Sequence, residues 1–287
     1  MSLNAQILDS PAFETLPAVE AELSYLIPMV EKPVNYTYEP PAGIPRQNGK
    51  HEIKKIAIRD ARPIAKNFSL DREGFAFVAH NSSVRDFYDE EEIGRVYYPE
   101  AEQLLKEITG ANQVVIFDHT LRNARRLQQG ETWIKEPAKR VHNDFTAKSG
   151  YTRARLELAA RGIENIDELL QQRFAIINVW RPIATVQESP LTVCDARSIA
   201  PTDLVAGDLV YRHRTGETYA VTYNTTHRWF YFPQMQQNEA LLIKCFDSVE
   251  DGIARFAAHT GFDDPTSPSN AAPRESIELR TFVFYPK

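Results

Sequence analysis

The residues best suited to chemistry are His142 and Asp144, within residues 141–146 (VHNDFT). Side chains alternate along an extended strand, so a histidine and an aspartate two residues apart point to the same face. An imidazole nitrogen and a carboxylate oxygen can then converge on one cation. A second histidine would complete a two-histidine, one-carboxylate triad that leaves three metal positions open, as in non-haem Fe(II) oxygenases. The alternative is an ordinary hydrogen-bonded pair.

Four other histidines could supply the third ligand of such a triad. His213 lies in a turn-like sequence (YRHRTGE), where a solvated side chain is expected. His119 precedes the motif and His227 precedes an aromatic run, so both are expected at strand ends. His259 follows the segment 253–258 near the end of the chain.

Composition limits the classes of function. With 287 residues, 43% of them hydrophobic, the chain can bury a full core. A net charge of -6 argues against a nucleic-acid partner, and no apolar run is long enough to cross a membrane. The first 20 residues lack the pattern of a secretory signal. Because Cys194 and Cys245 do not make a disulfide framework, a reducing cytoplasm is the expected location.

The elements that must position these residues are mostly short strands. Residues 1–50 are rich in proline and aromatic residues, which predicts an extended N-terminal arm with little regular structure, followed by one domain over residues 51–287. Helices are predicted at 98–109, 149–160 and 167–172, and short early strands at 54–59, 75–78 and 114–117. Seven later strands favour a β-sandwich or jelly roll buttressed by the helices. They are predicted at residues 174–180, 191–194, 209–212, 219–223, 229–232, 241–246 and 277–285.

A His-x-Asp motif, a late histidine and a later arginine on the last strand resemble the Fe(II)/2-oxoglutarate-dependent oxygenases. Over residues 70–285 the resemblance is more specific, because six short motifs occur there in the order found in one branch of these oxygenases. It points to the branch that includes the gibberellin desaturase, the cephem methoxylase component and hydroxylase/desaturases of fungal natural-product clusters. The motifs are HNDFT (142–146), NVWRP (178–182), HRWFYFP (227–233), LIKCFDS (242–248), HTGFDDP (259–265) and PRESIE (273–278).

This resemblance implies a mainly β fold with flanking helices, a double-stranded β-helix or jelly roll. It also implies that His142, Asp144 and His259 are the iron ligands, with His227 as the alternative for the last. The catalytic metal site would then consist of these three side chains.

The resemblance further implies an arginine that grips the distal carboxylate of 2-oxoglutarate, for which a guanidinium is well suited. Arg274 matches this arginine. Arg280 is the alternative, because the two residues are an even number of positions apart and their side chains would lie on the same face of an extended strand. Arg181 is expected either to bind a substrate or co-substrate carboxylate or to form a structural ion pair. Lys244 interrupts an apolar strand and is expected to face solvent; if buried, it would need an anionic partner.

The function implied is an enzyme that uses Fe(II), 2-oxoglutarate and O2 to hydroxylate or desaturate a small natural product of secondary metabolism. Two alternatives remain open from the residues. One is a non-catalytic jelly-roll subunit of a heteromeric oxygenase, and the other is a cupin-like metalloenzyme that does not use 2-oxoglutarate. A homodimer is the default assembly, with a heterodimer of related chains as the variant.

Overall fold

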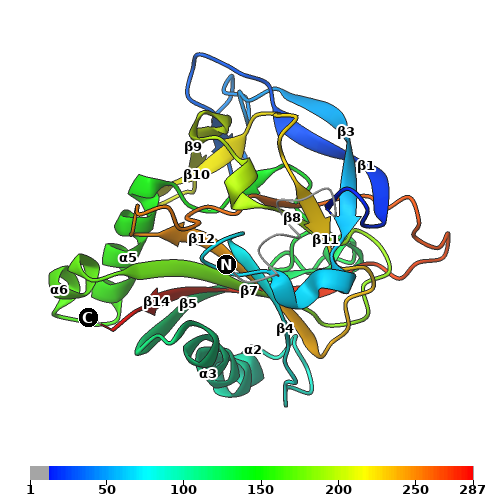
Figure 1. The fold of residues 1–287 in the computed structure, drawn as a ribbon. Coiled ribbons are helices and arrows are strands. Elements are labelled where there is room, and N and C mark those ends of the chain that lie inside the picture. Colours follow the sequence, from blue (N-terminus) through cyan, green and yellow to red (C-terminus); the bar gives the residue numbers. More distant parts are fainter. Residues whose placement is uncertain (1–12, 287) are drawn as a thin grey trace.

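Two β-sheets packed against each other form the body of the protein in the computed structural model, which describes residues 13–286 (Figure 1). The larger sheet has nine strands in the order β1 (Ala18–Leu26), β3 (His51–Asp60), β11 (Trp229–Tyr231), β8 (Leu191–Cys194), β13 (His259–Gly261), β6 (His142–Asn143), β10 (Thr215–Val221), β9 (Leu204–Val210) and β2 (Val34–Tyr36). The smaller has five, in the order β4 (Phe75–Ala79), β12 (Glu239–Asp247), β7 (Phe174–Pro182), β14 (Ser276–Phe284) and β5 (Gln113–Arg122). Most neighbouring strands are antiparallel, as in a jelly roll.

The helices flank the smaller sheet. Its outer face is covered by α3 (Tyr98–Thr109), preceded by α2 (Glu90–Glu92) and a π-helical turn at Ile93–Tyr97 (Figure 1). The remaining helices are α4 (Ala124–Gln128), α5 (Ala147–Ala160) and α6 (Ile166–Gln171), with 3-10 turns at Arg62–Asn67, Ala196–Ser198 and Pro201–Asp203. Among the described residues, none of these helices has the length and apolar character needed to cross a membrane.

Strand β7 shows how the two cores are separated. Phe174, Ile176 and Trp180 point between the sheets and pack in the inner core. Ile177 and Val179 point outward and pack beneath α3. All nine residues of β7 are buried, because this central strand is covered on both faces.

Several predicted elements agree closely with the structure. The helix predicted at 98–109 is α3, which ends where Gly110 takes a left-handed conformation with φ of 70°. Strand β5 is longer than predicted: it continues through residues 118–122, four of them polar, which are paired with β14. Strands β6 and β13 were not predicted as such, because two or three residues give no periodic pattern.

Two expectations about individual segments are wrong. The region expected to have little regular structure contains β1, which pairs with β3 over nine residues. Whether residues 1–50 act as a separate arm stays a prediction. Lys244, expected to face solvent, is fully buried, and its Nζ donates to Asp71 Oδ1 at 2.5 Å and Asp247 Oδ2 at 2.9 Å. These two carboxylates are the anionic partners that burial of the ammonium group requires.

Candidate metal centre

The three predicted ligands come together at the middle of the nine-stranded sheet. His142 lies on β6 and His259 on β13, and the two residues are directly opposite each other in the antiparallel pairing of these strands. Their imidazole rings are 4.5 Å apart between centroids. Asp144 follows β6 immediately. One ligand atom from each of the three lies within 4.8 Å of the others, and the described residues contain no other such group of His, Cys, Asp and Glu.

Backbone hydrogen bonds set the orientation of both imidazoles. Nδ1 of His142 is 2.8 Å from the carbonyl oxygen of Arg140, and Nδ1 of His259 is 3.1 Å from that of Ala257. A carbonyl oxygen can only accept, so each Nδ1 carries the proton and each Nε2 keeps its lone pair. Nε2 of His142 then faces Oδ1 of Asp144 at 3.4 Å, which brings two lone pairs together. A shared cation satisfies this arrangement.

The charge states of the three groups suit a divalent cation. Burial would raise the pKa of Asp144, but the Arg280 guanidinium, together with His142 and His259, outweighs burial and holds that pKa well below its usual range. Burial, and then the neighbouring His142, lower the pKa of His259 and favour the neutral ring. Burial lowers the pKa of His142, but Asp144 and the Arg140 carbonyl oxygen together raise it above its usual value, so the metal-free site favours a positive charge at this ring, and a bound cation would supply that charge and leave the ring neutral. Two neutral imidazoles and one carboxylate are a donor set for Fe(II).

Arg280 uses each of its three guanidinium nitrogens on a protein acceptor. Its Nε donates to Asp144 Oδ2 at 2.9 Å and its Nη2 to Glu278 Oε1 at 2.8 Å. Nη1 donates to Thr120 Oγ1 at 3.0 Å and lies 3.6 Å from Asp118 Oδ2. The side chain therefore has little hydrogen-bonding capacity left for a second carboxylate.

Arg274 is in the opposite situation. It is only 3% exposed, and its Nη1 donates to the carbonyl oxygen of Ser189 at 2.7 Å. Within residues 13–286, its buried Nε has no hydrogen-bond partner and no acid forms an ion pair with it. The guanidinium lies 5.6 Å from the Trp180 ring, and burial lowers the pKa of Arg274 to about 9. A Cβ on Gly261 would lie 3.3 Å from Nη1, so glycine leaves room beside this cation. A buried guanidinium with unused N–H donors is suited to bind an anionic ligand.

Arg181 points away from the metal centre. It occupies the outer face of β7, where its Nε donates to the Tyr97 hydroxyl at 3.2 Å and its Nη1 to the carbonyl oxygen of Gln237 at 2.6 Å. Its Nη2 contacts the His80 ring and donates to the His80 carbonyl oxygen at 2.9 Å. These contacts are those of a structural residue, although with neutral acceptors instead of the acid considered from the sequence.

His227 also lies outside the triad. Its Nε2 is 3.1 Å from Asp203 Oδ2, and its Nδ1 is 3.3 Å from the hydroxyl of Tyr25 on β1. The same hydroxyl accepts from the Trp229 indole at 2.7 Å. His227 thus belongs to a hydrogen-bonded group that ties β1 to β11.

Asn178 and Glu278 were given no role from the sequence, although both contact the groups around the triad. Asn178 Nδ2 donates to Asp144 Oδ2 at 2.9 Å, and Asn178 interrupts the otherwise apolar run 174–180 of a buried strand. A buried amide needs partners, so its position within β7 was a usable signal. Glu278 alternates with apolar residues in the same way on β14.

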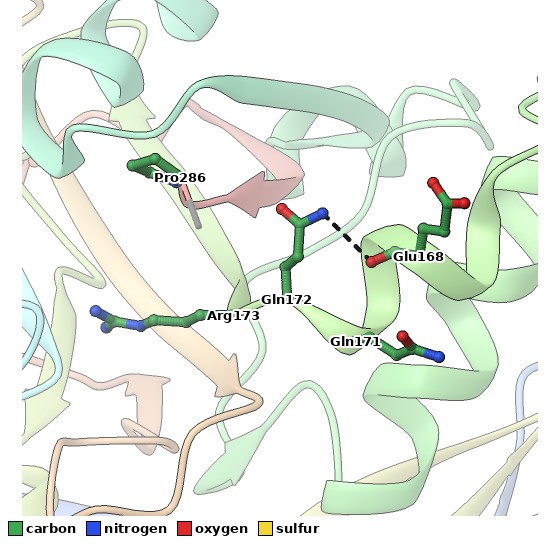
Figure 2. A pocket seen from close by; sticks show the side chains of 5 residues that line it. All are labelled: Glu168, Gln171, Gln172, Arg173 and Pro286. Atoms are coloured by element: carbon green, nitrogen blue, oxygen red, sulfur yellow. Dashed lines mark hydrogen bonds between the residues drawn. The ribbon is translucent and has the colours of Figure 1, made fainter.

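A surface pocket lies apart from the metal centre, where the end of α6 leads into β7 (Figure 2). Figure 2 shows its lining residues, Glu168, Gln171, Gln172, Arg173 and Pro286. None of them contributes to the triad or contacts it. The chemistry of this pocket is that of ordinary surface side chains.

Comparisons with known proteins identify the family. Residues 23–284 match the family model described as "Oxidoreductase/YMDC permease-like domain". Hydroxylase/desaturase CTB9 of Cercospora beticola is 35% identical over 260 residues, covering 82% of this chain and 78% of that protein. The Fe(II)/2-oxoglutarate-dependent dioxygenase nvfI of Aspergillus novofumigatus is 31% identical, covering 92% and 96%. The chain belongs to the family of Fe(II)/2-oxoglutarate-dependent dioxygenases.

A solved structure supports the same assignment. The iron and alpha-ketoglutarate-dependent endoperoxidase NvfI superposes with a TM-score of 0.84 at 29% identity, over 94% of this chain and 99% of the other. The predicted jelly-roll fold, enzyme class and cofactors Fe(II), 2-oxoglutarate and O2 are thereby confirmed. The comparisons favour neither a non-catalytic subunit nor a cupin-like enzyme. The narrower likeness to gibberellin desaturase and the cephem methoxylase stays a prediction.

Proposed function

We propose that this oxygenase hydroxylates or desaturates a small natural product, with His142, Asp144 and His259 as its iron ligands and Arg274 as the residue that binds 2-oxoglutarate. The observation that carries the proposal is the combination of a compact metal-binding triad with a buried arginine that lacks an acidic partner among the described residues. Relatives named as hydroxylase/desaturases support the reaction type.

When bound, iron, 2-oxoglutarate and O2 supply the oxidising power that removes hydrogen from a substrate C–H group, while 2-oxoglutarate is converted to succinate and CO2. The protein's residues hold and orient the reactants. His142 and His259 present neutral imidazoles through the hydrogen bonds at their Nδ1 atoms. Asp144 supplies one negative charge and Arg274 a positive one for the distal carboxylate of the co-substrate.

Arg274 is preferred to Arg280 for the co-substrate because of their different hydrogen bonding. The Arg280 guanidinium donates hydrogen bonds to Asp144, Glu278 and Thr120. Among the residues that the structure describes, Arg274 makes a single hydrogen bond, to Ser189, and its buried Nε–H has no acceptor. A carboxylate would satisfy that donor and the buried charge together.

The remaining expectations from the sequence are carried forward as predictions. A cytoplasmic location is one of them, and the two cysteines, Cys194 and Cys245, are both buried and unpaired, as expected for a reducing compartment. A homodimer remains the default assembly, with a heterodimer of related chains as the variant. The substrate is a small molecule in keeping with the family.

Anaerobic titration of the Fe(II)-loaded protein with 2-oxoglutarate tests the proposal. The observable is the weak visible charge-transfer band of the chelated keto acid. We expect the band in wild type and in His227→Ala, and its loss in His259→Ala. A band that needs His227 would contradict the ligand assignment. Absence of the band from iron-loaded wild type would contradict the use of 2-oxoglutarate.

A further inference from the structure

One oxygen of Asp144 is held by two donors from adjacent strands. Asn178 on β7 and Arg280 on β14 are directly opposite each other in the strand pairing. Asn178 Nδ2 and Arg280 Nε each donate to Asp144 Oδ2, both at 2.9 Å. Both donors lie in regular sheet structure, so the position of Oδ2 is determined by the pairing of the two strands.

The other oxygen of Asp144 faces the histidines. Oδ1 lies 3.4 Å from His142 Nε2, and the N–H donors to Asp144 among the described residues are directed at Oδ2 instead. A carboxylate with two free oxygens can bind a cation through both and occupy two of its positions. With Oδ2 already engaged twice, Asp144 presents only Oδ1.

Glu278 balances the charge that Arg280 brings. Its Oε1 accepts from Arg280 Nη2 at 2.8 Å, and the glutamate is 5% exposed. Asp144, Arg280 and Glu278 together carry one net negative charge, the same as Asp144 alone. Arg280 can therefore orient the metal carboxylate without cancelling its attraction for a cation.

We propose that Asn178 and Arg280 form a clamp that restricts Asp144 to binding the metal through Oδ1 alone, with Glu278 compensating the charge of Arg280. The inference rests on the proposed function to the extent that the triad binds the cation. Asn178, Arg280 and Glu278 are positioning residues that act through Asp144. The clamp keeps a third metal position free for the co-substrate and O2.

Mn(II) titration of the metal-free full-length protein tests the clamp, with free Mn(II) followed by electron paramagnetic resonance. Removing an outer partner of a metal ligand commonly weakens metal binding about 10- to 100-fold, and we expect this for Arg280→Gln and for Asn178→Ala. Arg280→Lys should recover part of the loss because it retains the charge and one donor. In the double variant of Asn178→Ala and Arg280→Gln, Mn(II) affinity should fall by less than the product of the two single fold-losses, since both residues act on the same oxygen of Asp144.

A matched control separates positioning from general stability. Arg62 is not a hydrogen-bond partner of any triad residue and donates twice to Glu239, at 2.8 Å each. Arg62→Gln breaks an ion pair of similar geometry and should leave Mn(II) affinity unchanged. Glu278→Gln keeps an acceptor for Arg280 but leaves its charge uncompensated, so it should weaken Mn(II) binding without releasing Asp144.

The infrared difference spectrum on Mn(II) binding reports the mode of carboxylate binding directly. The separation of the two carboxylate stretching bands is wider for one-oxygen than for two-oxygen binding. We expect the wide separation in wild type and in Glu278→Gln, and a narrower one in Arg280→Gln and Asn178→Ala. If Arg280→Gln does not fold in a urea titration, the neutral change Asn178→Ala carries the same comparison.

The outcomes distinguish the clamp from the proposed function. Mn(II) binding by Arg280→Gln that is unchanged or tighter than wild type would overturn the clamp, because Arg280 would then only repel the cation or support the fold. Unchanged carboxylate bands in both clamp variants would overturn it as well. Failure of wild type to bind Mn(II) at the triad, with no effect of His259→Ala, would instead overturn the ligand assignment on which the clamp rests.

Discussion

Replacing Arg274 with methionine should have opposite effects on co-substrate binding and on stability. The change removes the guanidinium but keeps a long apolar side chain beside Trp180. Loss of one partner of a buried charged pair costs about 2–5 kcal/mol of binding. At about 1.4 kcal/mol per tenfold, a cost of ~3 kcal/mol raises the Kd for 2-oxoglutarate by about 100-fold.

The stability of the ligand-free protein should rise in the same variant. Burial, followed by the charge of Arg122, lowers the pKa of Arg274 to about 9. The buried cation therefore destabilises the ligand-free protein. Its buried Nε also lacks a hydrogen-bond partner within the described part of the chain. Removing a buried, unsatisfied polar group relieves about 1–3 kcal/mol, which should appear as a higher urea midpoint.

Isothermal titration of 2-oxoglutarate into Mn(II)-saturated protein measures the first effect, and urea denaturation of metal-free protein the second. Arg62→Met is the matched control: it leaves Glu239 without its guanidinium partner, so it should lower the urea midpoint and leave 2-oxoglutarate affinity unchanged. A Kd for Arg274→Met within threefold of wild type would refute its role in co-substrate binding. A lowered urea midpoint would refute the argument that the buried cation strains the free protein.

Three further predictions concern the scaffold around the site, and urea denaturation measures each. Lys244→Met should lower the free energy of unfolding by about 2 kcal/mol, because the fully buried Asp247 loses one charged hydrogen-bond donor and keeps Arg173; a change below about 1 kcal/mol would contradict that view. Thr146→Val should lower it by about 1 kcal/mol through loss of the N-terminal cap of α5, whereas Thr146→Ser should be nearly neutral. Gly150→Ala should cost about 1–3 kcal/mol, since a Cβ would lie 2.5 Å from the ring of Phe246, and a neutral result would mean that this ring can move aside.

Local patterns were sufficient for much of the fold. The apolar positions and Gly110 predicted α3, and the apolar run 174–180 predicted the strand that is β7. The alternation rule placed His142 and Asp144 toward one cation. Each of these features depends on residues that are close together in the sequence, so it can be predicted from a single sequence.

Features that depend on pairing between distant segments could not be predicted in this way. The choice among four histidines required the resemblance, because only the pairing of β6 with β13 brings His259 opposite His142. Parity along β14 could not separate Arg274 from Arg280, whereas their contacts do. The burial of Lys244 depends on Asp71, which is 173 residues away in sequence.

The short strands of the metal centre have a consequence for how the protein folds. β6 and β13 have two and three residues and share one pair, His142 with His259. Asp144 and Arg280 are 136 residues apart in sequence. Contacts over such separations require closure of long chain loops and slow the search for the native state. We therefore expect these segments to dock late in folding, after the five-stranded sheet has formed. A bound cation should then hold them together in the way that a covalent cross-link would.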